Sequence, residues 1–324
     1  MQRRAFTLAL PSCAFPGLHS LAHAQDFPNK PIRYIVPVAA GGGSDMVGRA
    51  VTERWGKLLK QSFIVDNQGG GGGVIASQNT ARAAADGYTL MQGYVATHGT
   101  SPATRQLPYD PIKDFTPIGM IGGTPNVLVI NTDLPISDFR QFVEYTRANA
   151  GKLSYGSAGT GSLTHLTMEL LKQQTGLQMT HVPYRGVAPA FTDLLGGQTQ
   201  AMFPGLAAAM PHIKSGRAHA LAVTGKTRHP QIKDVPLLEE LGLKGFDAMQ
   251  WYGVVGPANM LPAVVRRLND TLSAALKTPN LRERLALEAV EPMPMSAQQF
   301  GDYIRADLAR WTGLARERRI ELST

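Results

Sequence analysis

The feature that most constrains this chain is a buried strand that ends in a glycine turn and leads at once into a helix. The apolar run Ile32–Val38 has strand character, and three consecutive glycines follow shortly after it. Glycine lets the backbone turn tightly and leaves N–H groups uncovered, while the start of the helix adds the positive end of its dipole. This geometry suits a carboxylate or a phosphate. We therefore predict an anion-binding loop made of Ala39, Ala40, Gly41, Gly42, Gly43 and Ser44.

Asp45 directly follows this loop. A carboxylate beside a bound anion is unfavourable unless it faces the helix or the far side of the loop. Aspartate is also one of the residue types whose side chain accepts a hydrogen bond from the first N–H groups of a helix. We therefore predict that Asp45 is a structural helix cap and not a ligand contact.

A second loop of the same kind lies between the strand-like run Leu153–Gly156 and a helical pattern over Ser162–Gln174. It combines glycines with three hydroxyl side chains, so it offers both backbone and side-chain donors. Two anion-binding turns without a recognisable catalytic set indicate capture of a small organic anion. The predicted contacts in this loop are Ser157, Gly159, Thr160, Gly161 and Ser162.

Two side chains outside these loops are further candidates for the site. His165 lies one turn into the helix and is predicted to face the cleft, although a histidine at a helix start commonly serves packing. Arg185 follows a strand and offers a bidentate grip on a carboxylate. The sequence alone leaves a surface position open for Arg185 as well.

The first 24 residues have the pattern of an export signal. Arg3 and Arg4 precede a mildly apolar stretch, and Ala22-His23-Ala24 fits the small-x-small cleavage rule. We predict a signal peptide over residues 1–24 that directs the chain to the periplasm, by the Sec or the twin-arginine route. The only cysteine, Cys13, lies inside this segment, so the mature chain has no disulfide and no thiolate metal ligand.

Strand-like and helical runs alternate along the chain, which is typical of parallel α/β sheets. No single linker divides the sequence into two halves. We predict two α/β lobes joined by crossing strands, with a ligand cleft between them. Residues 25–125 plus 250–324 form lobe 1, and residues 126–249 form lobe 2. The crossing strands are expected near Asn126–Ile130 and Trp251–Gly256.

The sequence carries no motif for other chemistry. It has no G-x-S-x-G elbow and no H-E-x-x-H, and its histidines lack zinc-ligand spacing. The net charge is +8, but the basic residues are dispersed and form no nucleic-acid-binding motif. We therefore predict no enzyme activity, no cofactor, no metal and no nucleic-acid partner. A sensing module that docks on a sensor kinase and a secreted α/β hydrolase are the alternative hypotheses.

Several short motifs follow one another along essentially the whole mature chain. They are Pro31–Asp45, Val65–Asn67 followed by glycines, Ala85–Leu90, Tyr109–Ile118, Gly151–Gly159, His181–Gly186 and Asp193–Gln198. In this order and spacing they resemble the receptor family of tripartite tricarboxylate transporters, also known as the Bug family.

The resemblance implies a type II periplasmic-binding-protein fold that closes on an organic acid. It also implies that the loops Ala39–Ser44 and Ser157–Ser162 hold the carboxylate, the first partly through ordered waters. The cargo would then pass to a membrane permease with a large and a small subunit. Di- and tricarboxylates, amino acids and aromatic acids are the candidate ligands, and we expect a monomer.

The chain departs from the family pattern at two places. Gln68 and a run of glycines stand where relatives carry Arg-Pro-Gly-Ala-Gly-Gly, which predicts a looser loop there. Pro204-Gly205 replaces a polar pair, often Asp-Asn, at a position that approaches the cleft. This second change predicts an unusually apolar part of the pocket and favours a hydrophobic or aromatic acid.

Overall fold

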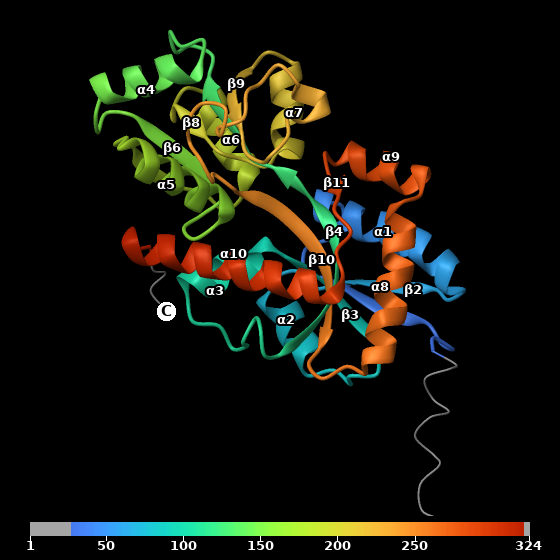
Figure 1. Cartoon of the computed structure of the whole chain (residues 1–324). Coiled ribbons are helices and arrows are strands. Elements are labelled where there is room, and N and C mark those ends of the chain that lie inside the picture. Colours follow the sequence, from blue (N-terminus) through green and yellow to red (C-terminus); the bar gives the residue numbers. More distant parts are fainter. Residues whose placement is uncertain (1–26, 321–324) are drawn as a thin grey trace, which may run out of the picture.

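The computed structural model describes residues 27–320 and contains two β-sheets, each flanked by helices (Figure 1). The signal peptide predicted over residues 1–24 lies outside this range. The first sheet has six strands in the order β11 (Glu291–Pro292), β4 (Phe115–Pro125), β10 (Met249–Pro257), β3 (Thr89–Tyr94), β1 (Ile32–Val36) and β2 (Phe63–Asn67).

Strands β1, β2 and β3 are parallel, whereas β10 runs antiparallel to β3 and β4. The strand and helix predicted around the first glycine turn are present as β1 and α1 (Gly43–Leu59). The apolar face of α1 is buried, including Val47, Val51 and Trp55, and α1 packs against α8. The remaining helical segments of this lobe are α2 (Val74–Ala81), η2 (Ala96–Thr100), α3 (Ser101–Thr104), α8 (Pro262–Leu276), α9 (Pro279–Leu287) and α10 (Ala297–Glu317).

The second sheet has five strands in the order β7 (Thr180–Pro183), β6 (Ser154–Ser157), β8 (Ala201–Met202), β5 (Val127–Asn131) and β9 (Ala218–Val223). Strand β6 is parallel to β7 and β8, and β5 is antiparallel to β8 and β9. Its helical segments are α4 (Phe139–Ala148), α5 (Leu163–Thr175), α6 (Val187–Leu195), α7 (Leu206–Lys214) and η3 (Pro230–Ile232). The two sheets confirm the predicted two-lobed α/β arrangement.

The chain crosses between the sheets at two points that lie next to each other. β4 passes into β5 at Asn126, where the first crossing was expected. The second crossing comes earlier than expected, because β10 pairs with β4 from Met249 onward and belongs wholly to the first sheet. Thr224 joins both points: its hydroxyl accepts from the backbone N–H of Asn126 at 2.9 Å and donates to the carbonyl of Ala248 at 2.5 Å.

Helix α10 connects the two lobes on one side. In Figure 1 it runs along the first lobe and ends beneath α5 of the second. Its buried Asp307 accepts a hydrogen bond from the indole N–H of Trp251 at 2.8 Å, which explains an acidic residue on the apolar face of this helix. One apolar core also extends across both lobes, with Trp251 of β10 and Phe300 of α10 from the first and Phe142 of α4 and Leu166 of α5 from the second.

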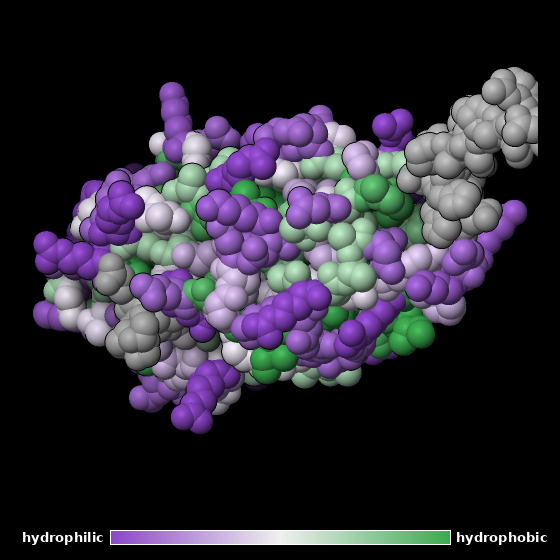
Figure 2. Space-filling view, turned by 90° about the horizontal axis from the view of Figure 1, so that it is seen from below, coloured by the Kyte–Doolittle hydropathy of each residue, from purple (hydrophilic) through white to green (hydrophobic). Residues whose placement is uncertain are grey.

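The outer surface is mixed in polarity. Figure 2 shows one face on which hydrophobic residues form small groups separated by hydrophilic ones. Within residues 27–320, no helix is both long and apolar enough to span a membrane.

Candidate functional site

A cavity of about 360 Å³ lies where the two lobes meet. One wall comes from η2 and α3 of the first lobe, and the facing wall comes from the loop between β6 and α5 of the second. Asn126, Gly205 and Gln250 line it at the junction between the lobes. A volume of this size suits a small molecule.

The loop between β6 and α5 presents the start of a helix to this cavity. Ser162 is the N-cap of α5: its hydroxyl accepts from the backbone N–H of His165 and donates to the carbonyl of Gly159 at 2.6 Å. The hydroxyl of Thr164 accepts from the N–H of Ala158 at 2.8 Å, so a second bond ties the loop to its helix. Of the predicted contacts, Thr160, Gly161 and Ser162 line the cavity.

Ser157 and Gly159, also predicted as contacts, do not line the cavity. Ser157 is fully buried, and its hydroxyl hydrogen-bonds Nε2 of His181 at 2.6 Å and both backbone groups of Gly159. A serine and a histidine in contact have the composition of a hydrolase pair. Here Ser157 is buried and neither residue lines the cavity, so the pair fastens the loop to β7.

The prediction that His165 faces the cleft does not match the structure. Its ring lies behind the loop, stacked on His181 with 3.8 Å between ring centroids. Nδ1 of His165 accepts from the backbone N–H of Gly161 at 3.1 Å. Burial lowers the pKa of both histidines to about 4, so both rings are neutral at pH 7. His165 therefore supports the loop from behind, a packing role that needs the neutral ring as acceptor.

A charged cluster braces the same region against the first lobe. The hydroxyl of Tyr155 donates to Glu169 at 2.6 Å, and Glu169 pairs with Lys172 and with Arg318, which follows α10. Burial of Glu169 raises its pKa, but hydrogen bonds from Lys172, Tyr155 and Arg318 outweigh this effect and lower the pKa to about 2. Through these contacts, strand β6, which precedes the loop between β6 and α5, is tied to the end of helix α10.

The loop between β1 and α1 lies outside the cavity lining. Ala39, Ala40, Gly41, Gly42 and Gly43 are exposed, and Ser44 is half-buried with its carbonyl and hydroxyl bonded by Nε2 of Gln92. The carboxylate of Glu288 lies directly over Gly43, since a Cβ on this glycine would meet it at 2.8 Å.

Asp45 has a structural role, but not as the predicted helix cap. The N-cap is Gly42, which makes no side-chain cap bond, and the helix has already begun where Asp45 stands. Its buried carboxylate turns back and accepts from the N–H of Gly41 at 2.9 Å, from Arg49 and from Asn67. These partners lower the pKa of Asp45 against the opposing effect of burial. Asp45 therefore fixes the loop from the helix side.

Arg185 is exposed and does not line the cavity. The arginine that does line it is Arg105, which the sequence prediction missed. Among the described lining residues Arg105 is the only charged one. Its Nη2 donates to the carbonyl of Gly71 at 3.0 Å and to the hydroxyl of Ser101 at 3.1 Å, while its buried Nε has no partner within residues 27–320. The bond to Gly71 also fastens the glycine loop, which the sequence predicts to be loose.

The cavity wall formed by η2 and α3, which the sequence prediction missed, does have a recognisable pattern in the sequence. Thr100, Ser101, Thr104 and Arg105 repeat at the spacing of one helix face and follow a buried strand. Such a polar stripe behind a strand is an ordinary ligand-facing pattern in α/β proteins. Asn126 offers no local signal, because its place in the cavity lining depends on where the chain changes lobes.

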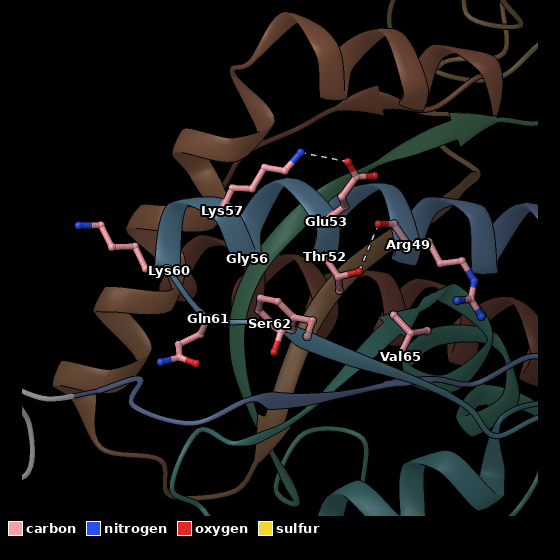
Figure 3. Close-up of a pocket in the computed structure, with 10 residues that line it drawn as sticks. Arg49, Thr52, Glu53, Gly56, Lys57, Lys60, Gln61, Ser62 and Val65 are labelled. Carbon is pink, nitrogen blue, oxygen red and sulfur yellow. Dashed lines mark hydrogen bonds and ion pairs between the residues drawn. The ribbon is translucent and has the colours of Figure 1, made fainter.

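A second hollow, of about 630 Å³, lies against α1 and β2 (Figure 3). All of its lining residues fall within residues 49–65, so it belongs to one lobe only. Lys57, one of its lining residues, forms an ion pair with Glu53, as Figure 3 shows. We therefore take the cavity between the lobes, which residues of both lobes line, as the candidate site.

The chain is similar to known proteins along most of its length. The family described as "Tripartite tricarboxylate transporter family receptor" matches residues 47–320. The chain is 32% identical to Protein BugT of Bordetella pertussis over 310 residues, which is 94% of each chain. It is also similar to two solved structures from Rhodopseudomonas palustris. Rpa4515 with adipate has 33% identity and a TM-score of 0.81, covering 91% of this chain and 99% of that one. MatC with bound malate has 31% identity and a TM-score of 0.75, covering 89% and 99%.

Proposed function

The chain belongs to the tripartite tricarboxylate transporter receptor family, a family of periplasmic solute-binding proteins, and from this premise we propose that it captures a small organic carboxylate. The captured acid is then delivered to a membrane permease with a large and a small subunit. The chain reaches the periplasm through the signal peptide at residues 1–24, acts as a monomer and catalyses no reaction.

The observation that carries the carboxylate proposal is the charge of the cavity. Arg105 supplies a guanidinium on one wall, and the N-terminus of α5 faces it from the other. Both favour a negative charge, the first by charge-assisted hydrogen bonds and the second by its dipole and free N–H groups. The relatives support the same class of ligand, since one is solved with adipate and one with malate.

Closure of the two lobes provides the binding mechanism. We take residues 25–125 plus 250–324 and residues 126–249 as the units that move, with the junction at Asn126 and Thr224 as the hinge. In the closed form the exposed loop Ala39–Ser44 covers the bound carboxylate with its backbone N–H groups. Lobe closure also removes water from the cavity, which strengthens the interaction with Arg105.

The test is thermal unfolding of the mature chain with a panel of aliphatic, amino and aromatic carboxylates. A ligand at a hundred times its Kd adds about 2.7 kcal/mol to the free energy of unfolding. A class of acids that binds the protein should therefore raise its Tm. Arg105→Gln should weaken binding by about tenfold or more, as expected for a lost bond to a charged group. Arg185→Gln is the matched control and should bind like wild type. Weaker binding by Arg185→Gln than by Arg105→Gln would contradict this location of the site.

A further inference from the structure

We propose that the bound carboxylate also carries a hydrogen-bond donor, a hydroxyl or an ammonium group, and that Oδ1 of Asn126 accepts from it. This inference rests on the proposed function and adds the chemical class of the ligand. It makes Asn126 the residue that distinguishes a hydroxy or amino acid from the plain acid of the same length.

The bonding of Asn126 leaves a single atom for a ligand. The residue is fully buried and lines the cavity at the junction between the lobes. Its backbone N–H and carbonyl both bond to Thr224. Its side-chain Nδ2 donates to the carbonyl of Phe203 at 2.9 Å. Since a carbonyl can only accept, this bond fixes which end of the carboxamide is nitrogen. Oδ1 is the remaining atom, and it has no partner within residues 27–320.

An amide oxygen accepts and never donates, so it selects the ligand by hydrogen-bonding type. A buried acceptor without a partner carries the cost of having lost its hydrogen bonds to water. A ligand that supplies an O–H or N–H recovers this cost, and a ligand with a methylene at the same place does not. Sites built to bond a ligand donor therefore discriminate strongly against the analogue that lacks it.

The surroundings of Asn126 are polar. Thr124, two residues earlier, is 2% exposed, and its hydroxyl also has no partner in the described chain. Gln250, which pairs with Thr124 in the sheet, lines the cavity. Gly205 forms an isolated antiparallel β-bridge with Asn126, and it has no side chain to fill this space. The Pro204-Gly205 pair therefore leaves the cavity open beside polar groups, while the apolar residues Val95, Leu163 and Val187 line other parts of it.

The charges around Asn126 favour neither a hydroxyl nor an ammonium group on the ligand. No carboxylate side chain lines the cavity among the described residues, so an ammonium gains no ion pair there. A hydroxyl and an ammonium both satisfy Oδ1, and the measurement separates them.

The experiment is calorimetric titration of the mature chain with acids matched in carbon skeleton. Succinate is compared with malate and aspartate, glutarate with 2-hydroxyglutarate and glutamate, and benzoate with 4-hydroxybenzoate. In at least one set, a donor-bearing acid should bind about tenfold or more tightly than its parent, the ratio that corresponds to about 1.4 kcal/mol. Equal affinity within every set that binds would overturn the inference while leaving the proposed function in place. Failure of every acid to bind would instead overturn the proposed function, and the inference with it.

A pair of variants assigns the discrimination to Asn126. Asn126→Ala should bring donor-bearing and parent acids to similar affinity. Asn131→Ala is the matched control, since Asn131 is also buried and donates from Nδ2 to the carbonyl of Leu194, but it does not line the cavity. This control should lose stability and keep the discrimination. Discrimination that survives in Asn126→Ala would exclude Asn126 as its source. If Asn126→Ala does not fold, the comparison of acids on wild type still decides the inference.

Discussion

Thr224 and Asn126 are held together by two hydrogen bonds of 2.9 Å, one in each direction between the lobes' connecting segments. The hydroxyl of Thr224 takes part in one of them and also donates to the carbonyl of Ala248. One buried side chain thus joins both passages of the chain between the lobes.

Thr224→Val should destabilise the protein by about 1–3 kcal/mol. Valine keeps the shape of threonine but removes the hydroxyl, which leaves the buried N–H of Asn126 without its partner. Urea unfolding measures the change. Thr192→Val is the control, because Thr192 is exposed and its hydroxyl bonds only within α6. Equal midpoints for the two variants would mean that the junction does not depend on this hydroxyl.

Ser162→Ala should lower both stability and ligand affinity. The variant removes the N-cap of α5, which costs about 1 kcal/mol, and frees the loop that lines the cavity. Ser296→Ala removes the N-cap of α10, which lies outside the cavity lining, and should cost a similar amount of stability. Calorimetric titration should show weaker binding only for the first variant. Weaker binding in both would point to a general effect of stability.

Gly42→Val tests whether the exposed first loop meets the ligand on closure. Gly42 has a φ of −85°, and a Cβ there meets no atom within 4 Å, so the fold accommodates the side chain. We expect a stability loss below about 1 kcal/mol, because valine is only a poorer N-cap than glycine. Affinity should fall clearly, and less so in Gly42→Ser. Wild-type affinity in both variants would remove this loop from the site.

Stability should fall as the pH drops from about 6.5 to about 4. His165 and His181 have folded pKa values near 4, below the usual 6.5, so the unfolded chain binds more protons across this interval. Their contribution is complete above pH 6.5 and is lost as the pH falls through the window. The difference between the urea unfolding midpoints at pH 7.5 and pH 5 measures this loss of stability.

His181→Gln should show a smaller difference between these two midpoints than wild type. His219→Gln, a change at an exposed histidine outside the stack, is the control and should retain the wild-type difference. The same drop in both variants and in wild type would assign the pH dependence to other groups.

Local features of the sequence predict the two loops together with the strand and helix on either side of each, β1 and α1 for the first and β6 and α5 for the second. A strand, a glycine turn and a helix start are neighbours in the chain, so the loop Ser157–Ser162 follows from spacing alone. The N-cap role of Ser162 also depends only on its own helix.

Several of the errors concern contacts between distant segments. His165 was assigned to the cleft because a helix start says nothing about His181, which stacks on it from the next strand. Asn126 was missed because its role depends on Thr224 and Phe203, both far away in the sequence. Arg105 has a local signal in the polar spacing of residues 100–105, but its bond to Gly71 in a separate loop is not visible in the sequence.

The lobes are joined by the bonded junction at Asn126 and Thr224, by the ion pair between Glu169 and Arg318 and by an apolar core that extends across both. Asn126 lies where the chain passes from one lobe into the other. In the closure proposed above, a residue next to the hinge moves less than a residue at the rim of the cleft. A ligand held by Asn126 therefore keeps its position while the outer parts of the cleft move around it.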